Sequence, residues 1–224
     1  LLFRVVPLQI HGFLPVPPML VSDELGPPDN PRLKPFALAA VMARTTTTQP
    51  AQLILKTLRD ETSRILAAER GDSSWLDGPI ADGARLFRDQ GVDPALALRW
   101  ARQMIAEPYA AKLSRISRDL QATAALWRKS GRIDDAKTAY TAVIAMLSEQ
   151  AEVENESAVL LTAAEELPHA YVSLADLVGD EELSRKLRLQ ADLWDRLYQD
   201  WRIAASGPAN MLPNIGSRVF CPAE

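Results

Sequence analysis

The feature of this sequence that most constrains its fold is a pair of similar segments, each of which ends an amphipathic stretch at a glycine. Gly91 follows residues 85–90 and Gly131 follows residues 125–130, and a second amphipathic stretch comes after each glycine. Glycine tolerates the left-handed backbone conformation that reverses the chain at the end of a helix. The pattern therefore predicts helical hairpins, and its recurrence 40 residues later, from position 91 to position 131, predicts hairpins that stack as a repeat.

The rest of the chain from about residue 51 onward also carries apolar residues at three- and four-residue spacing, the period of an α-helix. Asp93 and Pro94 are typical of a helix start, whereas Pro108 and Pro168 are expected to end or bend helices. No segment of this body alternates apolar and polar residues as a strand would, so the body is predicted to be all-α. The expected helices cover residues 36–44, 51–70, 80–90, 94–106, 109–130, 134–150, 154–167, 169–178 and 180–205.

The two ends of the chain differ from this helical body. Residues 1–35 hold eight of the 16 prolines together with many apolar side chains. Proline removes backbone donors and disfavours helix, so this segment is predicted to be extended and to lie on its own body or on a partner. We therefore expect a proline-rich arm with one short helix over residues 1–47, a helical domain over 48–206 and an extended tail over 207–224.

The overall composition excludes several classes of protein. With 47% hydrophobic and 24% charged residues, the chain has the proportions of a folded domain rather than a disordered one. Its net charge of −4 and the lack of a basic face argue against a nucleic-acid partner. A cleaved or anchoring segment before Leu1 is one explanation for the missing initiator methionine. It favours a periplasmic or other extracytoplasmic location over the cytoplasm and allows membrane contact through that segment.

Few side chains in this sequence can support nucleophilic or metal chemistry. The chain has two histidines, His11 and His169, and one cysteine, Cys221, without a nucleophile elbow, a phosphate-binding loop or zinc-ligand spacing. Glu166 and His169 have the Glu-x-x-His spacing of carboxylate-bridged di-iron bundles, but those sites need a second copy and the chain has none. We therefore predict no catalytic residue, no metal site and no cofactor, and we interpret His169 as a helix-end residue.

Three pairs of adjacent acidic residues are the remaining candidates for chemistry. We expect each pair at a helix start or on a solvent-facing side, where negative charge complements the helix dipole or is hydrated. The pairs are Asp134–Asp135, Glu165–Glu166 and Glu181–Glu182. The tryptophan-rich stripe of the last helix is interpreted as core.

The second glycine segment resembles a known repeat family. Gly131, Ala136 and Tyr140 match the turn glycine, the small residue and the following aromatic residue of a tetratricopeptide repeat, and Trp100 falls where Tyr140 does in the earlier segment. Residues 83–150 carry the resemblance. The 40-residue spacing exceeds the family period of about 34, and the Trp, Leu-Gly and Tyr signature of the first helix is absent. The resemblance implies antiparallel hairpins in an α-solenoid fragment with a concave binding surface, and an irregular helical bundle is the alternative.

These observations predict a non-catalytic protein–protein interaction or assembly module, a subunit of a larger complex whose partner is another protein. The candidate contact residues are large apolar side chains of the hairpins and the arm, namely Trp100, Trp127, Tyr140, Phe13 and Leu14. Two alternatives stay open. One is a helical enzyme that uses Glu166 or another carboxylate, with or without a metal. The other is a solute-binding helical-repeat protein of the cell envelope, in which the three hairpin aromatics ring a cavity.

Overall fold

The computed structural model describes residues 30–45, 50–67, 74–154 and 156–206. Within these ranges the chain forms seven α-helices and no strand, which confirms the all-α prediction. The helices are α1 (Lys34–Thr45), α2 (Pro50–Ala67), α3 (Asp77–Asp89), α4 (Pro94–Lys129), α5 (Ile133–Val153), α6 (Ser157–Ala175) and α7 (Glu181–Ser206). None of them is both long enough and apolar enough to cross a membrane. The predicted arm up to residue 29 and the predicted tail lie outside the described residues.

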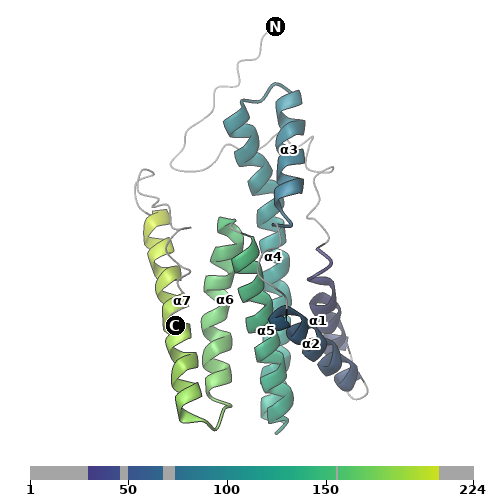
Figure 1. The fold of residues 1–224 in the computed structure, drawn as a ribbon, viewed down its shortest axis with the longest axis vertical. Helices are drawn as coiled ribbons and strands as arrows, with labels where there is room; N and C mark the ends of the chain where they lie inside the picture. The colour runs from purple at the N-terminus through teal and green to yellow at the C-terminus, as the bar shows by residue number, and fades with distance from the viewer. Residues whose placement is uncertain (1–29, 46–49, 68–73, 155, 207–224) are drawn as a thin grey trace.

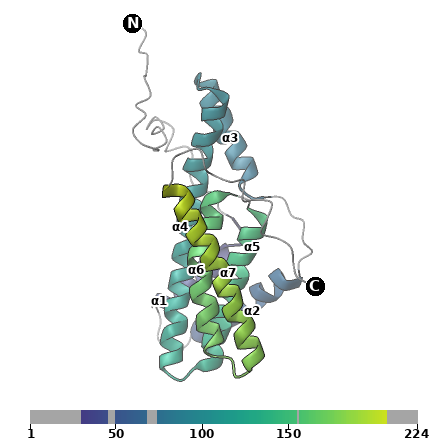
Figure 2. The ribbon, with the colours of Figure 1, turned by 90° about the vertical axis from the view of Figure 1, so that its left-hand side faces the viewer.

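The helices α4, α5 and α6 form the centre of the domain (Figure 1). α5 runs antiparallel to its two neighbours, and α4 and α6 are parallel. On one side, α1 and α2 pack together against α4 and α5, while α3 packs along the first part of α4. On the other side, α7 lies on the outside of α6, as Figure 2 shows, and contacts α6 alone among the described helices.

Both glycine elbows form as the sequence predicts. Gly91 has φ 84° and Gly131 has φ 78°, and each ends a helix that packs against the next one. The backbone bonds are equivalent at the two sites: the N–H of Val92 donates to the carbonyl of Phe87 at 3.1 Å, and that of Arg132 to Trp127 at 2.9 Å. These are the bonds of a helix closed by a left-handed residue. The two hairpins share a helix, because α4 is the second helix of the first hairpin and the first helix of the second.

The prediction that one helix ends and another begins at Pro108 and at Pro168 was wrong. α4 continues through Pro108 and α6 continues through Pro168. A proline in a helix interior costs about 3 kcal/mol, but burying one large apolar side chain contributes roughly 1.5–3 kcal/mol. Ile105 and Tyr109, on either side of Pro108, are 1% and 0% exposed. Tertiary packing on both sides of the proline therefore outweighs the lost hydrogen bond.

The helix start at Asp93 and Pro94 is confirmed, because the Asp93 carboxylate accepts hydrogen bonds from the N–H groups of Ala95 at 2.9 Å and Leu96 at 3.2 Å. The last helix covers nearly the expected range. Its aromatic stripe is core only in part. Ala191 is buried at 3% exposure, but Trp194 and Trp201 are half-buried. Because α7 contacts only α6 among the described helices, it buries only a narrow stripe.

Replacing Gly131 with alanine is expected to lower the free energy of unfolding by about 1–2 kcal/mol, because an L side chain is strained in the left-handed region. Nothing lies within 4 Å of a Cβ added at this position, so the effect is conformational rather than steric. Gly78→Ala, in the first turn of α3 with equal open space, is the matched control and should stabilise by up to about 1 kcal/mol. Urea denaturation measures both changes. If the two substitutions changed the free energy of unfolding in the same direction, the assignment of Gly131 to a turn that needs glycine would be contradicted.

Candidate functional site

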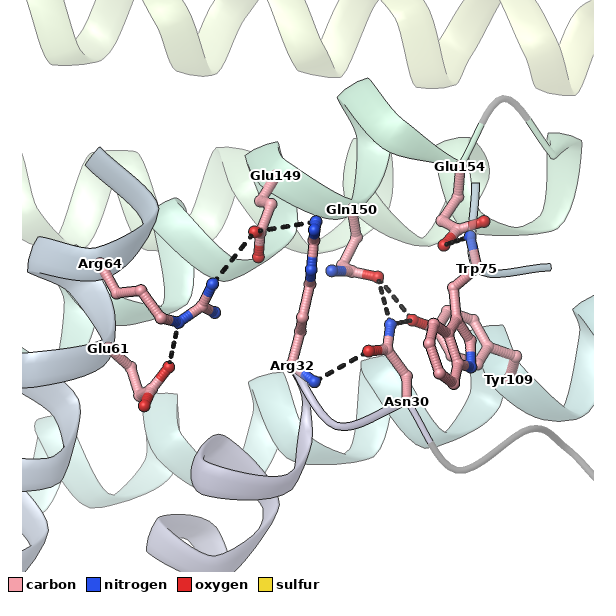
Figure 3. A network of polar contacts seen from close by, with 9 residues as sticks. All are labelled: Asn30, Arg32, Glu61, Arg64, Trp75, Tyr109, Glu149, Gln150 and Glu154. Carbon is pink, nitrogen blue, oxygen red and sulfur yellow. Dashed lines mark hydrogen bonds and ion pairs between the residues drawn. The ribbon is translucent and has the colours of Figure 1, made fainter. Parts of the chain in front are cut away.

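Polar side chains meet in the interior of the domain around Tyr109 of α4 (Figure 3). The Tyr109 hydroxyl donates to Oε1 of Gln150 at 2.5 Å, and Nδ2 of Asn30 donates to the hydroxyl at 2.5 Å. A cavity of about 260 Å³ lies beside this group, between residues 30–32 just before α1, Trp75 and the end of α5. Burial raises the pKa of Tyr109 above its ordinary value of 10.0. The phenol therefore stays protonated at neutral pH and acts as a donor rather than as a base.

Glu149 of α5 connects the two N-terminal helices to the centre of the domain. Its Oε1 lies 3.5 Å from Nη1 of Arg32, just before α1, and 3.8 Å from Nη1 of Arg64 on α2. Burial raises the pKa of Glu149 above 4.5, although both guanidinium groups act in the opposite direction. Its Oε2 is buried with no hydrogen-bond partner in the described structure. This carboxylate holds the α1–α2 pair in place at an electrostatic cost.

Glu154 explains why α3 begins at Asp77, three residues before the predicted start. The carboxylate is 1% exposed and accepts hydrogen bonds from the backbone N–H groups of Trp75 at 2.9 Å and Leu76 at 3.1 Å. The Ser74 hydroxyl also donates to it at 2.5 Å. A carboxylate so placed satisfies free donors at a helix start and complements the helix dipole. It serves as a long-range cap.

The prediction that the Glu165–Glu166 pair faces solvent was wrong for Glu166. Glu165 is exposed and pairs with Nη2 of Arg118 at 3.0 Å, but Glu166 is only 6% exposed and points at α4. Adjacent residues on a helix point about 100° apart. The Glu166 carboxylate lies 2.5 Å from Nε of Arg118, which raises the pKa of that guanidinium. Ser114 and Gln121 also donate to it, at 2.9 Å and 3.2 Å.

His169 lies in the interior of α6, so its interpretation as a helix-end residue was wrong. Its Nδ1 is 2.6 Å from Oε1 of Gln121, the residue that also donates to Glu166. No group of three or more His, Cys, Asp and Glu side chains is arranged for a metal ion among the described residues. The Glu166 carboxylate is already occupied by donors from α4, so we interpret this group as a tie between α4 and α6.

The predicted contact residues lie apart from one another. Trp100, Trp127 and Tyr140 are 8%, 8% and 2% exposed, which places them in the core. Trp100 packs edge-to-face on Phe87, with ring centroids 5.5 Å apart. The two tryptophans are 27 residue steps apart on one continuous helix, about 40 Å, so they do not ring one cavity. Phe13 and Leu14 lie outside the described residues.

An open groove lies where sequence reasoning placed no site. We name it the α4–α7 groove. Its volume is about 690 Å³, and its walls are residues 95–111 of α4 and Trp201 of α7, with residues 156–162 at the start of α6 between them. The α4 wall is about 24 Å long, from 16 residue steps of 1.5 Å. Eight of the 15 lining residues are apolar, and five of these are alanines: Ala95, Leu98, Ala106, Ala110, Ala111, Ala158, Leu161 and Trp201.

The charged groups of the α4–α7 groove are only partly paired. Nε of Arg102 lies 3.3 Å from Oε1 of Glu156, and burial raises the pKa of Glu156. Arg99 and Glu107 also line the groove, and neither forms an ion pair with any described residue. Oε1 of Gln103 is buried there without a hydrogen-bond partner in the described structure. The groove therefore presents an apolar surface with charge of both signs that is unpaired within the described part of the chain.

Replacing Glu166 with glutamine should lower the free energy of unfolding by about 1.5–3 kcal/mol, because the buried network loses its negative charge and one of its two acceptor oxygens becomes an NH2 donor. Glu165→Gln, which removes the exposed partner of the same Arg118, should cost less than about 1 kcal/mol. Urea denaturation at neutral pH compares the two variants. Equal effects would contradict the interpretation of Glu166 as the structural tie.

Glu149 should make stability depend on pH. Because its pKa is higher in the folded protein than in the unfolded chain, the folded state binds the proton more tightly. Its contribution to stability is therefore present at low pH and is lost as the pH rises from 4.5 through the raised pKa. Glu149→Gln removes this pH-dependent contribution. The free energy of unfolding of the native chain minus that of the variant should therefore fall over that interval, as measured by urea denaturation at a series of pH values. A difference in stability that stays constant over that interval would contradict this assignment.

Comparisons of the chain with protein-family models, with curated proteins and with solved structures found no match. Function is therefore inferred from the geometry of these sites.

Proposed function

We propose that the helical domain is a non-catalytic interaction module that binds a segment of another protein in the α4–α7 groove. The observation that carries this proposal is the groove itself, about 690 Å³ in volume and mostly apolar. Its volume is in the range of binding sites, about 300–1,000 Å³. Its α4 wall is four helical turns long, a shape that suits a polypeptide segment better than a compact small molecule.

The residues at the rim of the groove support binding to a protein. Trp201 is half-buried, and Leu98 is 38% exposed although both are large apolar side chains. Tryptophan and arginine are enriched among the residues that contribute most to protein interfaces, and the groove has Trp201, Arg99 and Arg102. A partner that covers this surface would remove apolar area from water without any rearrangement of the core.

The contacts of the buried carboxylates favour a structural role for these groups over a catalytic one. Glu154 and Glu166 accept several hydrogen bonds each, and Glu149 lies between two arginines. Each of the three connects separate helices or loops. A general base needs access to a substrate proton, and these groups are committed to neighbouring side chains and backbone.

The glycine elbows support a relation to helical-repeat scaffolds, in which stacked hairpins usually hold another protein. Gly91 and Gly131 close their helices with the same backbone bonds, and the two hairpins follow each other through the shared helix α4. Membership of the tetratricopeptide family, a place in a larger complex and an extracytoplasmic location remain predictions.

A photoreactive phenylalanine analogue at Leu98, in the groove, should form a covalent adduct with a discrete second protein when the full chain is irradiated in cells. The same analogue at Leu126, which is 65% exposed on the same helix but outside the groove, should not. Ala111→Trp, which fills the groove from an exposed position, should abolish the adduct. Adducts of equal yield from both positions, or adducts insensitive to Ala111→Trp, would contradict the proposal.

A further inference from the structure

We infer that the segment bound by the α4–α7 groove is an amphipathic α-helix that carries one acidic and one basic side chain about two turns apart, opposite Arg99 and Glu107. This inference rests on the proposed function. It specifies the conformation and the charge pattern of the partner segment, which the proposed function leaves open.

The length and the floor of the groove favour a helix. The α4 wall of about 24 Å matches some 16 residues, or four turns, of a facing helix. Helix axes approach to 8–10 Å where the side chains between them allow it. Alanines at positions 106, 110 and 158 leave room for that approach.

The backbone chemistry of the groove also disfavours an extended partner. An extended segment satisfies its N–H and C=O groups by adding to a sheet edge, and the described residues contain no strand. Against a mostly apolar wall these groups would be removed from water without partners. A helix satisfies its own backbone and can place an apolar face in the groove.

The two groove charges that are unpaired among the described residues specify where the partner segment carries its own charged side chains. Arg99 and Glu107 are eight residues apart on α4, about 12 Å along the axis, and neither forms an ion pair with a described residue. Arg102 is already paired with Glu156. A facing helix would therefore place opposite charges seven or eight residues apart on one face, because those positions return to the same side after two turns.

Gln103 lies between these two charges and adds a third determinant. Its Oε1 is buried and accepts no hydrogen bond within the described structure. A donor on the bound helix, such as an amide or a hydroxyl, would satisfy this oxygen and fix the register of the complex.

The test is a display selection of random peptides of about 20 residues, slightly longer than the ~16 that span the groove, against the full chain. Peptides that also bind the Ala111→Trp chain are removed. Enriched peptides should have apolar residues at i, i+3, i+4 and i+7 and should carry an acidic and a basic residue seven or eight positions apart. They should gain helical circular dichroism on binding.

A charge reversal then tests the assignment of the acidic position. Arg99→Glu should lower the affinity for the enriched peptides about five- to tenfold, as expected when a solvent-accessible ion pair becomes a repulsion. A lysine at the acidic position of the peptide should restore binding to the Arg99→Glu chain. Arg115→Glu, an exposed site of α4 outside the groove, should leave affinity unchanged.

The two possible failures are distinguishable. Groove-dependent peptides that lack the helical pattern, or that do not respond to Arg99→Glu, would overturn this inference and leave the proposed function standing. A selection in which no peptide remains once those that also bind the Ala111→Trp chain are removed would overturn the proposed function itself. Ala122→Trp, at an exposed position of α4 away from the groove, controls for a general effect of tryptophan.

Discussion

The structure depends on the continuity of α4. Four helices pack against it: α1, α3, α5 and α6. A break at Pro108 would separate the part that supports α3 from the part that supports α5 and α6. Ile105 and Tyr109 prevent this, because the burial of each contributes free energy comparable to the penalty of one interior proline. One continuous helix also gives the α4–α7 groove an unbroken wall.

The interior carboxylates then set the positions of the surrounding helices. Glu149 connects α5 to the α1–α2 pair, Glu154 caps α3 and Glu166 joins α6 to α4. Buried charges of this kind add little net stability, since desolvation offsets most of their attraction. Their geometry is nevertheless demanding, because each acceptor needs its donors at the right place. We infer that they contribute mainly to a single arrangement of the helices rather than to the total free energy of folding.

The sequence predicts local features well and long-range ones poorly. Gly91, Gly131 and Asp93 act through backbone atoms a few residues away, and all three behave as expected. The start of α3 depends on Glu154, 78 residues beyond Leu76 in the chain, so no local pattern contains it. Trp100 illustrates the same limit, since an aromatic residue at helical spacing fits a core or a contact surface equally well. The groove escaped prediction because three distant segments build it, although the alanines of α4 at helical spacing were a visible signal.

The placement of α7 connects the fold to the proposed activity. If α7 packed on both α4 and α6, its stripe would be buried and the groove would close. Instead α7 contacts α6 alone among the described helices, so Trp201 faces a space that α4 lines with alanines. In the interior, by contrast, Glu154 and Glu166 are each satisfied by several donors. Apolar area and charge that is unpaired among the described residues therefore coincide at one place, where, under the proposed function, a second chain would supply what the described helices do not.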